Sequence, residues 1–512
     1  MKENTKKIIL EIVIFLSILI IALAVRGYNL SELPRGIHVD EAGMAYDAFS
    51  LANFRVDRYL KHLPVYLINF GGGQSALYAY LAAICVKFLG ITTTAIRLPA
   101  LFCNIIAIVA VYLLGRKAFG RKGATILMFL WAINPWNIMS SRWGLDCNLL
   151  APLSIISLWL LFRAEKWYDY VVAGIAIGVT LYTYAISYLI MPLFLILIVS
   201  YMLYTKRITF KNVVILGIPI FILAIPLMLM LLVNNGFIKE INSFITIPKL
   251  LFYRGTEISF ANIVNNILNI KTLFTYDGLS YNSIEKFGTV YYFSIPFIVL
   301  GLTIEIMKLV KNIKNKKFEV NTGITLFFFS VCITILLIVD PNINKANAIY
   351  FPLMFLVFSS IKFLYEKMDK KIFLIYFSVM MMAYCLLFIS FINHYFNIYS
   401  VEWKYQPYFE DDLTNSIAIV NSKQELKDKK VNILTMSLNP YVYTLIVNQP
   451  SPYDFAKTRN EKDEWGKYLF NRQEINEDWV YIIKDYGDFA YDLANNYGFN
   501  TEYVGTYVIL YK

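Results

Sequence analysis

The sequence predicts an all-α polytopic membrane protein with about eleven transmembrane helices, followed by a small extracytoplasmic α/β domain. Hydrophobic residues make up 58% of the 512-residue chain, whereas soluble domains contain about 45–50% apolar residues. Apolar runs near the roughly 20 residues that one membrane crossing needs recur along most of the chain. From residue 393 onward the chain becomes polar and carries short β-type runs instead.

Eleven apolar runs are the predicted spans, and several are short, as expected for helices that cross beside polar cavities. They lie near residues 8–25, 97–115, 123–140, 148–162, 170–186, 188–204, 213–233, 291–310, 322–339, 347–364 and 372–392. The first run could instead belong to a signal peptide, because a basic start precedes its apolar core. The "AVRGYNL" that follows is a weak cleavage site, which favours an uncleaved first helix.

Clusters of Lys and Arg between the runs predict the orientation of the helices. The clusters are the start of the chain, "RKAFGRK", "RAEK", "KRITFK", "KLVKNIKNKK" and "KFLYEKMDKK". With the N-terminus inside, every cluster falls on the cytoplasmic side. Counting the apolar segment 75–90 as a further span would reverse all the later loops. We therefore expect a juxtamembrane or re-entrant helix there, within a first external loop at 26–96.

Two domains follow from this topology. Residues 1–392 form the transmembrane domain, with a second long external loop at about 234–290, and residues 393–512 form the extracytoplasmic domain. In that domain "VNILTM", "YVYTLIVN", "DWVYIIKD" and "TYVILYK" are expected strands, and "DFAYDLANNYGF" is an expected helix. The composition, rich in Lys, Asn, Ile and Tyr, is compatible with a multi-pass protein of a bacterial plasma membrane.

Charge and motifs exclude several classes of function. The net charge of +11 lies mostly between the apolar runs, where it sets topology rather than binding nucleic acid. The five cysteines lie in or beside apolar runs and form no CxxC pair, so neither a disulfide framework nor a metal site is expected. The sequence has no P-loop, no G-x-G-x-x-G after a strand and no H-E-x-x-H. Cytoplasmic nucleotide-dependent chemistry and a bound cofactor are therefore not expected.

The stretch "GIHVDEAGMAYD" is the first candidate site, directly after the first span. His38, Asp40 and Glu41 stand at the start of a predicted helix, where a carboxylate favours the N-terminal dipole. Ionisable residues beside membrane spans are candidates for function, because placing them there is costly. The alternative is a helix cap with a solvated acidic neighbour. His38 could orient a carboxylate or be a solvated loop histidine.

Further candidates fall on the same predicted external side. The short connection "NIMSSRWGLDCNLL" holds Arg142 and Asp146 near the membrane surface, although the pair could form only a local i, i+4 ion pair worth a few tenths of a kcal/mol. Lys345 is the sole basic residue of "DPNINKANAIYFP" and is a candidate phosphate ligand. The remaining candidates are Tyr184 and Tyr188, which could also be ordinary interfacial tyrosines, and Arg254, which could be a solvated loop charge.

These side chains suit chemistry on a lipid-carried substrate. Carboxylates can act as general bases on a hydroxyl, cations bind a phosphate leaving group, and aromatic rings stack on sugars or prenyl chains. The outer face of a membrane offers no nucleotide sugars, so an enzyme there needs a lipid-linked donor. A transporter or flippase for lipid-linked sugars, or a polysaccharide polymerase-like protein, is the alternative. Transporters tend to have paired halves with polar groups at mid-membrane, and no internal repeat is visible here.

The first span followed by P-x-G-x-H-x-D-E resembles the GT-C superfamily of glycosyltransferases, in the branch of protein O-mannosyltransferases and aminoarabinose transferases. Three further stretches resemble that branch: "TAIRLPALFCNIIAIVAVYLLGRKAFGRKGA", "NPWNIMSSRWGLDCNLL" and "NKANAIYFPLMFL". The resemblance is good over about 1–200, thin over 200–390 and absent from the C-terminal domain. Ala348 and Ile349 stand where the branch commonly has a basic residue, and Lys345 could replace it.

The resemblance implies that Asp40 is the catalytic residue and that the donor is a polyprenyl-phosphate-linked sugar, transferred with inversion and without a metal. The acceptor would be a surface glycan, a glycolipid or a protein. Asp40 would accept the proton of the acceptor hydroxyl, while Arg142 or Lys345 stabilises the leaving phosphate. Glu41 and Asp146 would bind hydroxyl groups of the donor or the acceptor.

Overall fold

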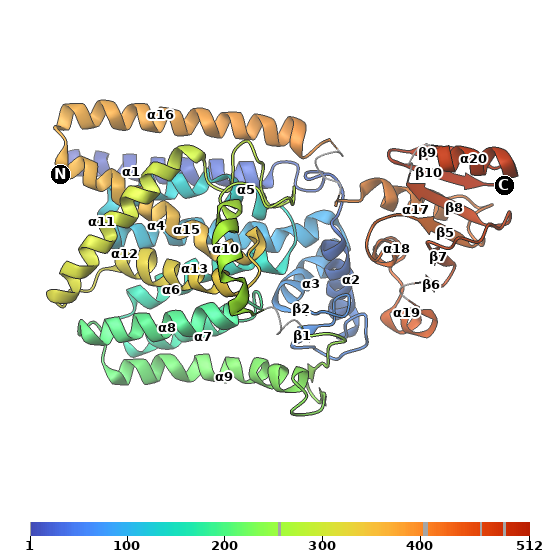
Figure 1. The fold of residues 1–512 in the computed structure, drawn as a ribbon, viewed down its shortest axis with the longest axis horizontal. Coiled ribbons are helices and arrows are strands. Elements are labelled where there is room, and N and C mark those ends of the chain that lie inside the picture. Colours follow the sequence, from blue (N-terminus) through green and yellow to red (C-terminus); the bar gives the residue numbers. More distant parts are fainter. Residues whose placement is uncertain (1, 254–257, 403–407, 461–462, 485–487) are drawn as a thin grey trace.

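The computed structural model describes residues 2–253, 258–402, 408–460, 463–484 and 488–512. Figure 1 shows a bundle of long helices with a smaller sheet domain beyond one end, and the N-terminus at the opposite end. The long helices are α1 (Lys2–Gly27), α4 (Thr93–Ala132), α6 (Leu150–Arg163), α7 (Trp167–Thr180), α8 (Ser187–Tyr204), α9 (Phe210–Asn234), α11 (Ile295–Lys314), α13 (Phe329–Ile338), α15 (Tyr350–Lys367) and α16 (Lys370–His394).

Each of the eleven predicted runs contains a helix, although the run 170–186 is helical only to Thr180 and the run 123–140 is interrupted at Ile133 and Asn134. Within the described residues nine helices are long and apolar enough to cross a membrane. One of them, α4, consists of two helices joined at Gly120, whose φ is 76°. A Cβ on Gly115 would lie 3.0 Å from Cα of Ala124, so the two halves pack closely as a hairpin. The remaining run is α7, which is helical over only 14 residues.

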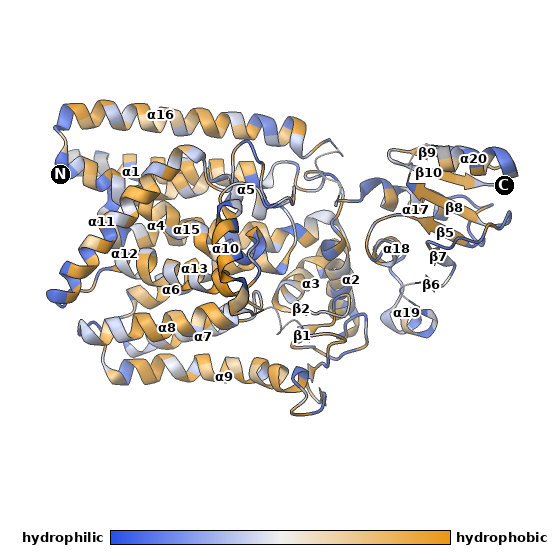
Figure 2. Ribbon diagram, in the orientation of Figure 1, coloured by the Kyte–Doolittle hydropathy of each residue, from blue (hydrophilic) through white to orange (hydrophobic). Residues whose placement is uncertain are grey.

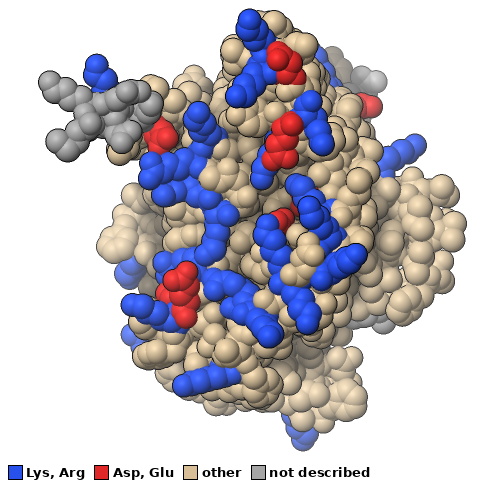
Figure 3. Space-filling view, turned by 90° about the vertical axis from the view of Figure 1, so that its left-hand side faces the viewer, with Lys and Arg blue, Asp and Glu red and all other residues tan. Residues whose placement is uncertain are grey.

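The basic loops lie together at the end of the bundle away from the sheet domain. Figure 2 shows hydrophobic residues along the long helices, and Figure 3 shows Lys and Arg gathered on the end face. A hydrogen bond from Arg207 to the carbonyl of Ala164 joins two of these loops, and one from Tyr201, near the end of α8, to the carbonyl of Lys317 reaches a third. The prediction that these loops share one side is therefore met by the fold.

The first long loop forms a folded layer at the other end. It contains α2 (Val39–Phe54), β1 (Tyr66–Leu67), β2 (Gln74–Ser75) and α3 (Leu77–Leu89). Helix α3 covers the segment expected not to cross, and its 13 residues span only about 20 Å at 1.5 Å per residue, which is too short for a full crossing.

Short elements complete the bundle and tie its loops together. They are α5 (Pro135–Ser140), α10 (Ile263–Asn269), α12 (Val320–Thr322), α14 (Ile343–Ala346), β3 (Ile241–Asn242) and β4 (Thr246–Ile247), with short 3-10 or π-helical turns at Asp146–Leu149, Phe260–Asn262, Ile270–Leu273, Tyr292–Ser294, Gly323–Phe328, Asn347–Ile349 and Tyr395–Tyr399. The backbone of Thr246 in β4 bonds to Val65 and His62 of the first loop. The second long loop therefore packs against the first.

The C-terminal domain is a mixed six-stranded sheet in the order β6-β7-β5-β8-β10-β9. The elements are α17 (Asp411–Ser422), β5 (Val431–Leu434), α18 (Tyr441–Asn448), α19 (Pro452–Thr458), β6 (Glu464–Trp465), β7 (Tyr468–Phe470), β8 (Val480–Lys484), α20 (Asp488–Tyr497), β9 (Asn500–Val504) and β10 (Tyr507–Tyr511). Alternate residues of β8 pack on opposite faces: Ile482 lies in the core with α17 and α18, and Ile483 in the core with α20. The sheet is thus covered by helices on both faces, as expected for an α/β domain.

Three of the four strands expected in this domain, and the helix α20, are confirmed. The prediction of a strand at "YVYTLIVN" is wrong, because this segment is α18. Its β-branched and aromatic residues favour a strand. However, Tyr441, Val442 and Leu445 recur at helical spacing and are buried in one cluster with Ala42 and Tyr46 of α2. Packing between the two domains therefore overrides the local preference.

Candidate active site

The sequence His38-Val39-Asp40-Glu41 folds as a reciprocal helix cap. Nδ1 of His38 accepts the N–H of Asp40 at 3.2 Å, and the Glu41 carboxylate accepts the N–H of His38 at 3.3 Å. The backbone N–H groups of Asp40 and His38 are thus satisfied by the side chains of His38 and Glu41, respectively. The cap alternative is thus realised by His38 and Glu41, and it leaves the Asp40 side chain in the first turn of α2 without a capping role.

The two adjacent carboxylates have opposite surroundings. The Asp40 side chain is 32% exposed, and its Oδ1 accepts a hydrogen bond from Nδ2 of Asn69 at 3.4 Å. The Glu41 side chain is fully buried and lies 3.0 Å from Nε of Arg97. Its Oε1 also accepts the N–H of Gly144 at 2.7 Å. Asp40 can therefore meet a substrate, whereas the Glu41 oxygens are taken up inside the protein.

His38 is buried rather than solvated. Its ring lies in a cluster of aromatic side chains, with centroid distances of 4.9 Å to Tyr281, 5.2 Å to Trp143 and 5.6 Å to Phe409. Burial lowers the pKa of His38, and the carboxylates of Asp40 and Glu41 oppose the shift. Because Nδ1 accepts the Asp40 N–H, the neutral ring carries its proton on Nε2.

Trp143, Tyr281 and Phe409 come from three distant parts of the chain and line the same region. Phe409 belongs to the start of the C-terminal domain and forms a backbone bridge with His38. Burial raises the pKa of Tyr281, and the nearby charge of Asp40 raises it further, so this phenol stays protonated. Tyr281 and Asn69 are missed by the sequence analysis, since no motif or charge marks either residue.

Arg142 is placed differently from its prediction as a phosphate ligand. Its guanidinium is buried and donates to the carbonyls of Val25 and Arg26 at 2.8 and 2.9 Å. Two more hydrogen bonds reach the carbonyls of Tyr28 and Leu33 at 2.7 and 2.9 Å. The four Nη hydrogens of Arg142 thus satisfy carbonyls at and beyond the end of α1, which a helix leaves open, and this geometry gives no support to phosphate binding.

Asp146 joins the loops around Asp40. Its Oδ2 accepts the N–H of Ser75 at 3.0 Å and its Oδ1 the N–H of Cys147 at 2.8 Å. Cys147 is buried in one cluster with Trp143 and Phe409, whose rings pack against His38. Nδ2 of Asn347 donates to the carbonyl of Cys147 at 2.8 Å, bringing the late loop to this point.

Three of the four remaining predicted residues lie near Asp146 or the aromatic cluster. Lys345 lies half-buried in α14, which contacts the turn Asp146–Leu149. Tyr184 packs against the cluster of Trp143 and Cys147. The hydroxyl of Tyr188 lies within electrostatic range of Asp146. Arg254 lies outside the described residues. Among the described residues, no group of three or more His, Cys, Asp or Glu side chains could hold a metal ion.

Asp57, in the folded layer of the first long loop, leads to a prediction about pH and stability. Burial and then the charge of Asp47 raise the pKa of this carboxyl to about 7. The folded protein thus holds a proton that the unfolded chain releases above about pH 4, so stability falls as pH rises from about 4 to 7. Asp57→Asn should remove this dependence and raise stability at pH 8 by about 1–4 kcal/mol. Unfolding midpoints of both proteins between pH 5 and 8 would measure the effect, and parallel curves would contradict it.

Comparisons with known proteins identify this fold. Residues 74–230, less than a third of the chain, match the family model described as dolichyl-phosphate-mannose-protein mannosyltransferase. No curated protein matches the sequence. The crystal structure of ArnT from Cupriavidus metallidurans bound to undecaprenyl phosphate is similar with a TM-score of 0.54 and 10% identity, over 99% of this chain and 98% of that chain. The apo state of ArnT gives a TM-score of 0.51 and 12% identity over the same shares.

At these identities the likeness to ArnT shows a common fold. The family model matches the segment that contains α3, α4 and the turn with Asp146, which is the part of the bundle that borders Asp40. This chain therefore has the fold of ArnT, and its residues 74–230 are similar to the dolichyl-phosphate-mannose-protein mannosyltransferase family.

Proposed function

We propose that this protein transfers a sugar from a polyprenyl-phosphate-linked donor to a hydroxyl group of a glycan, lipid or protein acceptor, with Asp40 as the general base. The observation that carries the proposal is the partly exposed Asp40 carboxylate at the start of α2, bordered by aromatic rings. The neighbouring acidic side chains Glu41 and Asp47 are buried and paired with arginines. Among these three carboxylates, Asp40 is the one open to a substrate.

A lipid-phosphate donor is supported by the comparisons. The ArnT structure is bound to undecaprenyl phosphate, and the family model is named for dolichyl-phosphate mannose. Both are long-chain polyprenyl phosphates. The many apolar side chains exposed on α1, α9 and α16 suit a membrane environment, in which such a donor resides.

In the proposed reaction the acceptor oxygen attacks the anomeric carbon of the sugar. Asp40 takes the hydroxyl proton, and the bond between the anomeric carbon and the phosphate oxygen breaks, so the polyprenyl phosphate leaves with the electron pair. Attack from the face opposite the leaving group inverts the anomeric centre. Lys345 is the proposed phosphate ligand, because the Arg142 donors are bound to carbonyls. Asp146, Tyr184 and Tyr188 are proposed to contact the sugar, and no cofactor is invoked.

The proposal also includes an orientation in the membrane. The basic end faces the cytoplasm, and Asp40 with the C-terminal domain faces outside, at a bacterial plasma membrane. In this arrangement the C-terminal domain, whose Phe409 and Glu410 pair with the first loop, meets the acceptor.

Mass spectrometry of surface glycans, lipids and proteins from cells with and without the gene would test the function. Loss of one sugar from one class of acceptor is expected. Purified protein in liposomes, given a labelled polyprenyl-phosphate sugar and the affected acceptor, should then release polyprenyl phosphate and label the acceptor. Movement of the intact donor across the bilayer without cleavage would instead identify a flippase and overturn the proposal.

A further inference from the structure

Asn69 lies between Asp40 and a buried charge cluster. Its Nδ2 donates to Oδ1 of Asp40 at 3.4 Å, and its Oδ1 accepts from Nη2 of Arg58 at 2.7 Å. We infer that Asn69 is the positioning residue of Asp40 and that it is held in place by Arg58 and the C-terminal domain, an inference that rests on the proposed function of Asp40.

The orientation of the Asn69 amide is determined by Arg58. A guanidinium group only donates hydrogen bonds, so the amide oxygen has to face Arg58 and the amide NH₂ group has to face Asp40. The side chain is buried, at 6% exposure, so water cannot substitute freely for either partner. Asp40 thus receives an N–H donor that holds its carboxylate in one orientation.

Arg58 is itself fixed on every side. Its Nη2 donates to Oδ2 of Asp47 at 2.8 Å, and its Nε donates to Oδ1 of Asp47 at 3.1 Å. Both side chains are almost fully buried. The Phe70 ring lies 5.4 Å from the guanidinium carbon. A Cβ on Gly43 would lie 2.7 Å from Nη2 of Arg58, so the glycine on α2 lets the guanidinium lie against this helix. The charge cluster is therefore built into the surface of α2.

The C-terminal domain supplies the outer contact of this cluster. The Tyr441 hydroxyl in α18 lies 3.2 Å from Nη1 of Arg58, and both residues are buried. Arg459 in the same domain donates to the carbonyl of Arg58 at 3.0 Å. Docking of the C-terminal domain and the position of the base are therefore coupled through Arg58 and Asn69.

The test is the pH profile of transfer by purified Asn69→Asp, Asn69→Ala and Tyr441→Phe. Asn69→Asp places a second carboxylate beside Asp40, so its acid limb should move up by about one pH unit or more. Asn69→Ala removes the donor, so kcat should fall about 10- to 100-fold and the acid limb should shift in the same direction. Tyr441→Phe should give a smaller change of the same kind. Asn53→Ala, an exposed asparagine on α2, is the matched control and should be unchanged.

Two results separate this inference from the function itself. If Asp40→Asn is inactive while the Asn69 variants lose activity without any shift of the acid limb, Asn69 has only a structural role and the inference is overturned. If Asp40→Asn keeps transfer, the proposed function fails first. Each variant should have a thermal unfolding midpoint within a few degrees of wild type, which shows that it is folded. If the Asn69 variants unfold, the pH profile of transfer by Tyr441→Phe tests the inference instead.

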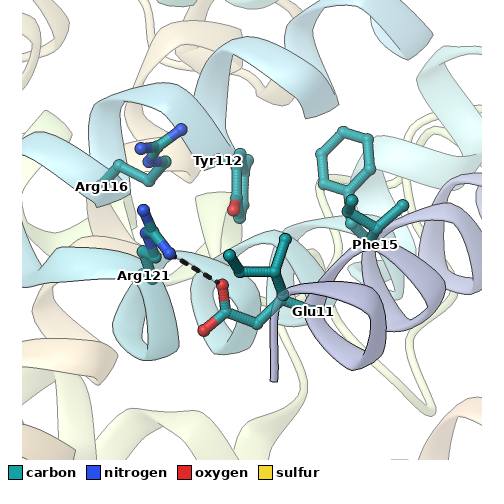
Figure 4. Close-up of a pocket in the computed structure, with 7 residues that line it drawn as sticks. Glu11, Phe15, Tyr112, Arg116 and Arg121 are labelled. Carbon is teal, nitrogen blue, oxygen red and sulfur yellow. Dashed lines mark ion pairs between the residues drawn. The ribbon is translucent and has the colours of Figure 1, made fainter. Parts of the chain in front are cut away.

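A separate observation concerns a groove at the basic end of the bundle (Figure 4). The groove has a volume of about 290 Å³. Its lining combines apolar and charged side chains from α1 and α4: Ile8, Glu11, Ile12, Phe15, Tyr112, Arg116 and Arg121. Nη1 of Arg121 lies 3.5 Å from Oε2 of Glu11, and the guanidinium carbon of Arg116 lies 6.0 Å from the centroid of the Tyr112 ring.

The arrangement matches one class of ligand. Ile8 and Ile12 are 47% and 52% exposed within the apolar part of α1, which gives a surface for an acyl chain. Arg116 and Arg121, both of the basic loop "RKAFGRK", line the charged part of the same groove (Figure 4). We propose that this groove binds an anionic phospholipid, with its phosphate at the two arginines and one chain along α1.

Native mass spectrometry of the protein in nanodiscs of phosphatidylglycerol or phosphatidylcholine tests this site. Wild type should retain phosphatidylglycerol preferentially, and Arg116→Ala with Arg121→Ala should reduce its retention at least about 5-fold. The matched control is Arg163→Ala with Lys166→Ala, which removes two positive charges from another loop of the basic end. Equal loss in both double variants, equal retention of the two lipids, or displacement by millimolar inorganic phosphate would each overturn the proposal.

Discussion

Asp40→Asn is expected to reduce sugar transfer by about 100- to 10,000-fold while leaving the folded protein unchanged, because asparagine cannot accept the proton of the acceptor hydroxyl. The replacement keeps the size of the side chain and the backbone N–H that caps α2 through His38. The side chain is 32% exposed, so no buried charge loses its partner. Release of polyprenyl phosphate by the reconstituted protein measures transfer, and thermal unfolding in detergent measures the fold.

A near wild-type rate for Asp40→Asn would contradict the assignment of the base. A variant that loses both transfer and its thermal transition would assign Asp40 a structural role instead. Glu41→Gln is the matched comparison for Asp40→Asn, because it makes the same carboxylate-to-amide change at the next residue.

Glu41→Gln is expected to lower the free energy of unfolding by about 3–5 kcal/mol, because it leaves Arg97 charged and buried without a carboxylate. Both side chains are fully buried. Arg97 also donates to the carbonyls of Leu30, Pro34 and Gly36 at 2.9, 3.1 and 2.6 Å. Loss of the pair therefore loosens the segment that leads from α1 to Asp40. Thermal and denaturant unfolding of the purified variant would measure the loss.

A Glu41→Gln protein as stable as wild type but unable to transfer sugar would contradict this structural role and restore Glu41 as a substrate ligand. Replacing both partners by apolar side chains, as in Glu41→Leu with Arg97→Met, should recover part of the stability, because no unpaired charge then stays buried. The two adjacent acids should thus fail in different ways, Asp40 in chemistry and Glu41 in folding.

Much of the architecture follows from local patterns. Each of the eleven apolar runs contains a helix, and the basic loops gather at one end. Both features follow from the hydropathy and charge of individual residues, which decide how each segment meets a membrane. Strands β5, β8 and β10 and helix α20 also follow from their periodicity. The prediction of a strand at Tyr441–Asn448 was wrong because this segment packs as a helix against α2, which belongs to the other domain.

The site was only partly predictable from the sequence, because several of its contacts are made by residues that are distant along the chain. The Asp-Glu pair after the first span, Asp146 and Lys345 could be selected as charges beside membrane spans. Tyr281 is 241 positions from Asp40 and Asn69 is 29 positions away, and neither carries a charge that a pattern could detect. The Arg142 guanidinium is bound to carbonyls at the end of α1, which a sequence motif does not reveal.

By itself, the sequence determined that this is a membrane protein with a helical core, long polar loops and an acidic pair directly after the first crossing. Only the tertiary structure decided which of the two acids is open. Arg97, 56 positions away from Glu41, neutralises that carboxylate in the interior, while the cap made by its neighbours leaves Asp40 at the surface. Burial and charge pairing are set by residues distant along the chain, so they exist only once the loops have packed.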